Sequence, residues 1–297
     1  MRAGADRRRL LRLIGLAGAA LLVPSSVPRG PLATRWYGVA LGAPARIELL
    51  GVEPARARSL IAACLEEVAR LEAIFSLYDP ESALSRLNRE GVLRRPPAEL
   101  LEVLGLAHRL AQLSEGAFDP TVQPLWLAVA RGAGREERRA ARARVGVREL
   151  EESPEAVVLH RPGMAVTLDG IAQGYLTDRV AELLRSHGVD RVLVDLGELR
   201  ALGSRPDGAP WRIGRSEPTP IALTEGALST SWPFVDGRPR ILDPRTGEPP
   251  AGFEPVTVQA PEAVVADGLS TALAVADAAA ADRLLAAFPG ARRVPAA

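Results

Sequence analysis

The chain has little cysteine, few aromatic residues and almost no net charge, and each shortage excludes a class of protein. Cys64 is the only cysteine among 297 residues, so an internal disulfide is impossible. Aromatic residues make up 4% of the chain, which argues against a base-stacking platform for nucleic acid. The formal net charge of +1 argues against a basic nucleic-acid surface, so we expect no nucleic-acid partner. Three scattered histidines have no spacing typical of a zinc site.

Length and patterning indicate a protein with a large core. A chain of 297 residues can form one large domain or two small ones. Cys64 shares a helical stripe with Leu60, Val68 and Leu71, so we predict that it is a core residue.

The N-terminus has the pattern of an export signal. An arginine-rich run, Asp6–Arg12, precedes an apolar stretch, Leu13–Val23, that is too short to span a bilayer comfortably. The arginine run fits the twin-arginine export route, which predicts a periplasmic protein. The alternatives are an uncleaved signal anchor and a basic disordered tail.

These features divide the chain into three parts. We predict a twin-arginine-type signal peptide over residues 1–28, a linker over 29–35 and a single domain over 36–297. Inside that domain, helical periodicity predicts helices over Pro54–Phe75, Pro97–Gln112, Tyr175–His187, Ala266–Val275 and Ala279–Phe288. Strands are predicted over Arg46–Leu50, Val166–Leu168, Arg191–Leu196, Ala209–Ser216, Ala227–Ser231, Ile241–Leu242 and Pro255–Ala260. Residues 76–91 are predicted to be mostly loop, and residues 131–144 a solvated charged helix. Because strands and helices are mixed without strict alternation, the fold class is α+β.

The most informative chemical pattern lies near the C-terminus. Asp267 and Thr271 stand four residues apart where the pattern turns helical, which places both oxygens on one helix face. One carboxylate and one hydroxyl suit a hard cation such as Mg²⁺. The alternative is that this cluster caps the start of the helix.

Seven motifs in order resemble the ApbE-type flavin transferases, also called FAD:protein FMN transferases. They span residues 36–275 and comprise Phe75–Asn88, Ala117–Thr121, Gly170–Tyr175 with Asp178, Val192–Gly197, Ser229–Ser231, Asp243–Gly247 and Ala266–Thr271. The resemblance implies a single ApbE-like (T-fold-like) α+β domain that uses FAD and Mg²⁺. It further implies transfer of FMN from FAD to a Thr hydroxyl of a target protein, with release of AMP.

The resemblance also assigns site residues. It places the metal ion on the side chains of Asp267 and Thr271 and on the main-chain carbonyl of Gly170. It places the flavin contacts at Leu41, Tyr78, Ala117, Phe118, Asp119, Gln173 and Leu242. From the residues alone, Tyr78 offers a flat face for the flavin ring or packs as a loop residue on the core. Asp119, which precedes Pro120, is equally typical of a turn or a helix cap.

The chain departs from the family pattern at several of these motifs. Thr167 replaces an Asp, and Gln173 replaces a Lys that would sit near phosphate. Trp232 stands where a Gly is usual, and Arg240 stands where a His is common. Arg240 is a candidate for the missing positive charge; the alternative is a solvent-facing strand residue.

These variants resemble a subgroup linked to nitrous oxide reductase maturation. In that subgroup the acceptor would belong to a membrane electron-transfer complex and carry an FMN-binding type domain. Two other functions stay open at this point: a periplasmic FAD-binding carrier, and a hydrolase that splits FAD to FMN and AMP.

Overall fold

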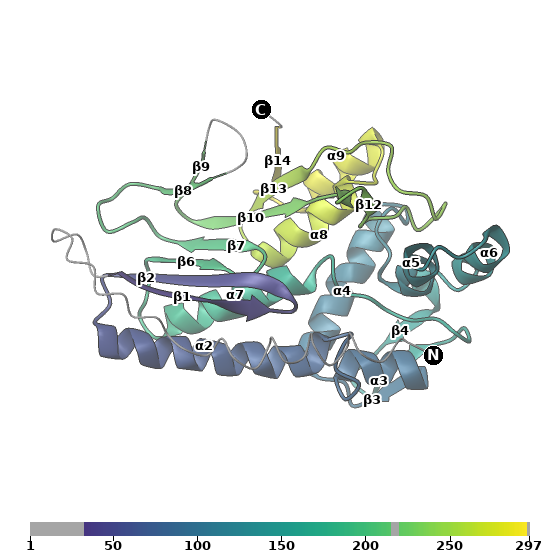
Figure 1. Ribbon diagram of the computed structural model, residues 1–297, viewed down its shortest axis with the longest axis horizontal. Coiled ribbons are helices and arrows are strands. Elements are labelled where there is room, and N and C mark those ends of the chain that lie inside the picture. Colours follow the sequence, from purple (N-terminus) through teal and green to yellow (C-terminus); the bar gives the residue numbers. More distant parts are fainter. Residues whose placement is uncertain (1–32, 215–219, 296–297) are drawn as a thin grey trace.

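A mostly helical layer packs against one antiparallel sheet (Figure 1). The structure is a computed structural model, and it describes residues 33–214 and 220–295. The seven strands of the sheet lie in the order β1-β2-β6-β7-β10-β13-β14, and every neighbouring pair is antiparallel. Their bounds are β1 Ala33–Ala40, β2 Ala43–Leu50, β6 Val192–Asp195, β7 Leu199–Leu202, β10 Gly226–Ser231, β13 Val256–Ala260 and β14 Arg292–Val294. This arrangement confirms the α+β prediction.

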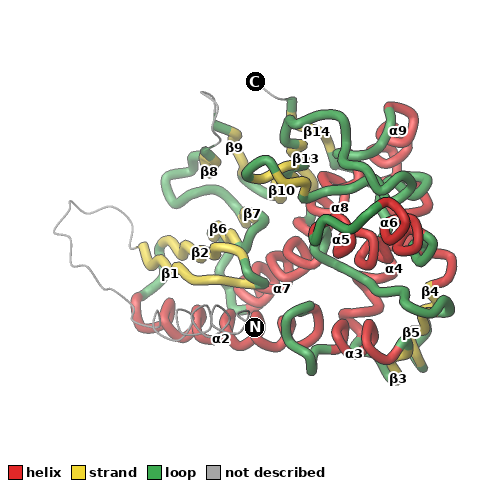
Figure 2. Tube along the Cα trace, turned by 45° about the vertical axis from the view of Figure 1, so that its right-hand side comes forward, coloured by secondary structure: helices red, strands yellow, loops and turns green. Residues whose placement is uncertain are grey.

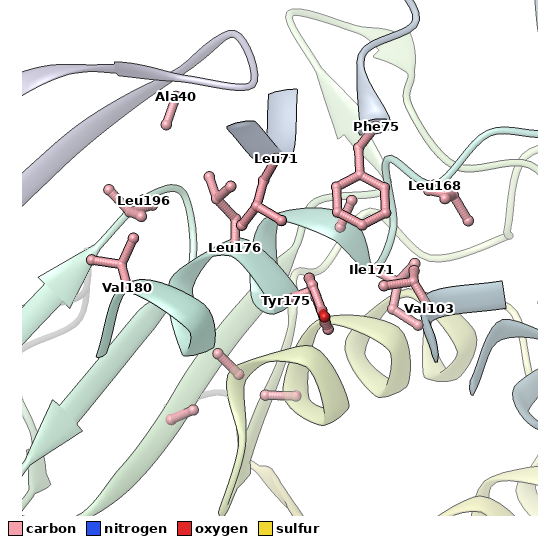
Figure 3. Close-up of a cluster of buried hydrophobic side chains, with 14 of the residues drawn as sticks. Ala40, Leu71, Phe75, Val103, Leu168, Ile171, Tyr175, Leu176, Val180 and Leu196 are labelled. Carbon is pink, nitrogen blue, oxygen red and sulfur yellow. The ribbon is translucent and has the colours of Figure 1, made fainter. Parts of the chain in front are cut away.

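Three helices, α2 (Pro54–Phe75), α7 (Ala172–Ser186) and α8 (Ala263–Leu273), cover one face of the sheet (Figure 2). The main core fills the space between them. Figure 3 shows Leu71 and Phe75 of α2 directed toward Ile171 and Tyr175, with Ala40 and Leu196 nearby. The Phe75 and Tyr175 rings meet edge to face, with centroids 5.6 Å apart.

Cys64 belongs to the buried stripe of α2, as predicted. Burial raises the pKa of its thiol to about 12, so the group is an inert core residue.

The other face of the sheet is covered in part by a two-stranded ribbon of β8 (Trp211–Ile213) and β9 (Ile221–Leu223). Trp211, Ile213 and Leu223 of this ribbon pack on Leu50 and Leu193 of the sheet. The helices α4, α5 and α6 gather at one end of the molecule (Figure 1). The remaining elements are α3 Ala83–Glu90, β3 Val92–Arg94, α4 Ala98–Leu113, η1 Pro120–Val122, α5 Gln123–Ala130, α6 Arg135–Arg142, η2 Val147–Glu149, β4 Leu150–Glu152, β5 Ala156–Leu159, β11 Phe234–Val235, β12 Arg238–Pro239 and α9 Ala278–Ala287.

Helices α7 and α8 pack closely enough that only glycine fits at one position. A Cβ added to Gly174 in α7 would lie 2.3 Å from the carbonyl oxygen of Ala263 in α8. Asp178, one turn further along α7, caps α8: its carboxylate accepts hydrogen bonds from the backbone N–H groups of Ala263 and Val264 at 2.9 and 2.8 Å. The two contacts fix where α8 begins and therefore where its second turn lies.

Three secondary-structure predictions are wrong. The predicted loop 76–91 contains α3, because Ser82 caps its N-terminus and Gly91, with φ 73°, ends it in the left-handed conformation. Val166–Leu168 is no strand: the side-chain amide of Asn88 both donates to the carbonyl of Val166 and accepts from its N–H, taking the place of a neighbouring strand. Ile241–Leu242 is irregular and leads into the predicted turn.

Two further comparisons concern the N-terminus. Strand β1 begins at Ala33, so residues 33–35 of the predicted linker pair with β2. The predicted signal peptide over residues 1–28 lies outside the described residues. Among the described residues, no helix is both long and apolar enough to cross a membrane.

Candidate active site

A pocket of about 290 Å³ lies where β10, the start of α7 and the second turn of α8 meet. Its walls also include the segment before α5, Gln123 and Trp126 of α5, and several residues between Thr230 and Pro244. All three predicted metal-binding residues line it, namely Gly170, Asp267 and Thr271. Residues that are far apart in the sequence are therefore brought to one pocket by the packing of α7 on α8.

Asp267 is a buried residue of this pocket. Helix α8 begins at Ala263, with Glu262 as its N-cap residue, so Asp267 lies in the second turn and the capping alternative is wrong. Its side chain is 3% exposed, and Oδ2 accepts a hydrogen bond from the backbone N–H of Gly174 at 3.0 Å. The carboxylate is thus oriented by the first turn of α7.

Thr271 follows Asp267 by one helical turn, and Gly170 lies directly against it. The hydroxyl of Thr271 is 3.2 Å from the Ser231 hydroxyl, which also lies 2.7 Å from Ser270 Oγ. A Cβ on Gly170 would fall 3.0 Å from Thr271 Oγ1. The missing side chain therefore lets the backbone at Gly170 approach the hydroxyl of Thr271.

Negative charge is concentrated in the pocket. Burial raises the pKa of Asp267, and the charges of Asp169 and Asp178 raise it further. Burial also raises the pKa of Glu198, and its proximity to Asp267 adds to that rise, although hydrogen bonds from Ser229 and from the backbone of Thr230 oppose it. A cation bound between these two buried acidic side chains would reduce their mutual repulsion and stabilise their ionised forms.

The residues present fit a magnesium ion. Mg²⁺ prefers oxygen ligands and keeps several waters, so one carboxylate, one hydroxyl and one carbonyl are an adequate protein set. Across residues 33–214 and 220–295, no three His, Cys, Asp or Glu side chains converge on a possible metal position. Of the lining groups, Asp267 with the oxygens of Thr271 and Gly170 would hold such an ion.

Five of the seven predicted flavin contacts line the same pocket: Ala117, Phe118, Asp119, Gln173 and Leu242. Asp119 also has a structural role. Its carboxylate accepts hydrogen bonds from the backbone and hydroxyl of Thr121, at 2.8 and 2.6 Å, and from the backbone of Val147 at 3.1 Å. It caps η1, as one of its two interpretations predicted. Burial raises the pKa of Asp119, and these hydrogen bonds oppose that rise.

The other two, Leu41 and Tyr78, are not among the pocket's described lining residues. Leu41 lies in the turn between β1 and β2, where its backbone N–H donates to Glu72 Oε1 at 2.8 Å. Tyr78 is 86% exposed, so the alternative in which it packs on the core is wrong. Contact between either residue and the flavin stays a prediction.

Arg240, the candidate for the positive charge that Gln173 lacks, lines the pocket. Desolvation raises the pKa of Asp169, and the nearby Arg240 guanidinium opposes that rise. The alternative described Arg240 as a solvent-facing strand residue. Arg240 is exposed, but it lies in a bend outside the strands, so the strand assignment is wrong.

Sequence reasoning missed other lining residues, above all Glu198, Trp126 and Trp232. Trp232 was recognised only as a departure from the family pattern, and Glu198 directly follows the motif Val192–Gly197 without belonging to it. Trp126 lies in no motif, and its only sequence signal was its closeness to Ala117–Thr121.

Comparison with known proteins agrees with this geometry. The ApbE family model matches residues 41–294. A protein of Klebsiella pneumoniae named FAD:protein FMN transferase is 28% identical over 302 residues, covering 88% of this chain and 85% of that protein. A protein of the same name from Haemophilus influenzae is 33% identical over 253 residues, covering 72% and 71%.

Solved structures show the same fold. The apo form of the Pseudomonas stutzeri flavinyl transferase ApbE superposes with a TM-score of 0.77 at 26% identity, covering 89% of this chain and 95% of that one. The Vibrio cholerae flavin transferase ApbE gives a TM-score of 0.76 at 27% identity, covering 89% and 97%. The matched region includes the whole pocket, and the chain belongs to the ApbE family.

Proposed function

We propose that this protein is a magnesium-dependent FAD:protein FMN transferase that moves FMN from FAD to a Thr hydroxyl of an acceptor protein and releases AMP. The observation that carries the proposal is the meeting of Gly170, Asp267 and Thr271 in one pocket. Family membership and the names of the relatives support the same activity.

The reaction exchanges one phosphorus–oxygen bond for another. The acceptor hydroxyl oxygen forms a bond to the FMN phosphorus, the bond from that phosphorus to the AMP phosphate breaks, and the hydroxyl proton is released. Such transfers depend on positioning and charge neutralisation more than on covalent help from the protein. Mg²⁺, held by Asp267, Thr271 and the Gly170 carbonyl, would neutralise charge on the diphosphate.

The chain's own groups prepare the pocket for this exchange. The Gly174 N–H holds Asp267 in place, and the Ser231 hydroxyl positions that of Thr271. The Arg240 guanidinium is available to bind diphosphate oxygens, which Arg can do in a bidentate manner.

One assay separates the proposal from its two alternatives. Purified protein is incubated with FAD, Mg²⁺ and an FMN-binding type acceptor domain, while AMP and protein-bound flavin are measured. AMP together with covalent flavin supports the transferase. AMP alone indicates an FAD hydrolase, and tightly bound FAD without AMP indicates a carrier; either result would overturn the proposal.

We further propose that the protein is exported to the periplasm and serves a membrane electron-transfer complex of the type linked to nitrous oxide reductase maturation. The arginine run Asp6–Arg12 supports export, and the variant motif Thr167–Gly174 supports the subgroup. Fractionation of cells that carry a tagged chain tests the first proposal, with Arg7→Lys/Arg8→Lys expected to keep the protein in the cytoplasm. Loss of covalent flavin from the complex in a deletion strain tests the second.

A further inference from the structure

Two tryptophans line the pocket, and the chemistry described above uses neither. Trp126 lies on α5, and Trp232 directly follows β10. The two other tryptophans have structural positions: Trp211 is buried under the sheet, and Trp36 packs against the main core. Half of the chain's four tryptophans therefore line a single pocket.

Trp232 lies beside the predicted metal site. The residue before it, Ser231, contacts the Thr271 hydroxyl at 3.2 Å, so the Trp232 backbone is fixed one residue away from a predicted metal-binding group. The residue is 49% exposed, although its side chain is one of the largest apolar groups in the chain. A large apolar ring left half exposed at a pocket is typical of a surface that binds a ligand.

Trp126 contacts the same region, although it lies more than 100 residues earlier in the sequence. Its indole N–H donates to the carbonyl of Arg240 at 3.1 Å, and the N–H of Arg240 donates to Pro233 at 2.8 Å. Both tryptophans are therefore connected through one stretch of chain, residues 232–242, which we name the hairpin segment.

The hairpin segment is well ordered by its own contacts. Asp236 and Gly237 have φ of 51° and 72°, the pair of positive values that a tight two-residue hairpin turn needs. The Phe234 ring stacks on Phe253 with centroids 4.3 Å apart. These contacts hold Trp232 and the partner carbonyl of Trp126 in place before any ligand binds.

The chemistry of the pocket calls for a ligand with two unlike parts. Asp267 and Thr271 suit a metal-bound phosphate, whereas Phe118, Val235 and Leu242 are apolar. FAD carries both kinds of group. Its isoalloxazine ring ends in a dimethylbenzene edge that suits apolar walls, whereas adenine is polar along every edge.

We propose that Trp126 and Trp232 bind the isoalloxazine ring of FAD, an inference that rests on the proposed function. Trp232 supplies a stacking face where the family usually has a glycine. This makes the hairpin segment the part of the chain that recognises the flavin half of the substrate. Tyr78 is not among the pocket's described lining residues, so its contact with the flavin stays a separate prediction.

Calorimetric titration of the full chain with FAD, riboflavin and ADP in the presence of Mg²⁺ tests the assignment. Trp232→Leu and Trp126→Leu should each weaken FAD and riboflavin binding by about 5- to 150-fold, the range for loss of one aromatic stacking contact. ADP binding should be unchanged. Trp232→Phe should retain most of the affinity because it keeps a ring.

Tyr37→Leu is the matched control, because Tyr37 is an exposed aromatic residue on β1 outside the pocket. It should leave all three affinities unchanged. If Trp126→Leu fails to fold, the half-exposed Trp232 still decides the question. Unchanged FAD binding by Trp232→Leu, or a loss for ADP equal to that for riboflavin, would overturn the inference. A wild-type chain that binds no FAD would instead overturn the proposed function.

Discussion

At the scale of single residues, Asp267 combines burial with a charge that its surroundings oppose. Its pKa is raised by burial and by neighbouring carboxylates, so the ionised form is held at a cost to stability. A buried carboxylate whose ionised form destabilises the fold is typical of a functional site. Substitution should therefore separate activity from stability.

We predict that Asp267→Asn abolishes FMN transfer while the free energy of unfolding at neutral pH stays the same or rises. The amide keeps the shape and an acceptor for the Gly174 N–H, but it removes the charge that attracts the metal and repels Glu198. Urea denaturation and AMP release measure the two effects. Asp267→Ala should also abolish transfer. Normal transfer by either variant at sub-millimolar Mg²⁺ would refute the metal assignment.

Arg240 gives a second prediction at this scale. Arg240→Ala should slow transfer by at least about tenfold, equivalent to about 1.4 kcal/mol, because it removes the guanidinium that we propose binds the diphosphate. The control is Arg205→Ala, a loop arginine whose guanidinium lies 3.8 Å from the Asp207 carboxylate. Steady-state rates with FAD compare the two variants. Equal rates would leave Arg240 without a role in transfer.

At the scale of elements, the close packing of α7 on α8 sets the geometry of the site. Gly174→Ala would place a methyl group 2.3 Å from the Ala263 carbonyl oxygen, so α8 must shift. We predict a loss of about 1–3 kcal/mol or more, measured by urea denaturation, together with weaker Mg²⁺ binding because Asp267 moves with α8.

Gly105→Ala is the matched control for this change. Gly105 lies on an exposed position of α4, and an added Cβ would contact nothing within 4 Å. This substitution should stabilise the protein by about 0.4–1 kcal/mol. If Gly174→Ala behaves like the control, the contact between the two helices is looser than described.

Removing the Asp178 cap tests the interface between α7 and α8 without adding atoms to it. Asp178→Ala leaves the backbone N–H groups of Ala263 and Val264 unpaired and removes a carboxylate 3.5 Å from the Arg200 guanidinium. We expect a loss of about 1–3 kcal/mol in thermal or urea unfolding. Asp277→Ala, which removes the cap of the outer helix α9, should cost no more than about 0.5–2 kcal/mol. A smaller loss for Asp178 than for Asp277 would contradict this ranking.

The same elements show what the sequence could and could not predict. Helix α2 was predicted with both ends correct because its apolar stripe is long and regular. Helix α3 was missed because it has only eight residues, although Ser82 and Gly91 mark its ends. The extended segment at Val166 depends on the distant Asn88 amide, and no local pattern reveals such a partner.

For the site, the sequence singled out eight residues that line the pocket, three as metal ligands and five as flavin contacts, but it missed much of the wall. Asp267 and Thr271 are one turn apart on one helix, so spacing alone related them. Glu198 and Trp126 reach the pocket only through tertiary packing of strands and helices. Their presence could not be derived without knowing how those elements meet.

At the scale of the whole molecule, the near-neutral chain contains a locally acidic pocket. The formal net charge is +1, yet Asp169, Glu198 and Asp267 line one pocket with Arg240 as a facing cation. FAD carries a negatively charged diphosphate. Without a cation, these carboxylates would repel the substrate that the rest of the pocket is shaped to bind.

We therefore predict that Mg²⁺ and FAD bind with positive coupling. Calorimetric FAD titrations with Mg²⁺ and with EDTA should differ in Kd by about 5- to 150-fold, and FAD should strengthen Mg²⁺ binding by the same factor because coupling is reciprocal. In Asp267→Asn this coupling should largely disappear, since the metal loses its carboxylate ligand while one repulsive charge is also gone. Equal FAD affinity with and without Mg²⁺ in the wild-type chain would show that the acidic pocket does not hold the diphosphate.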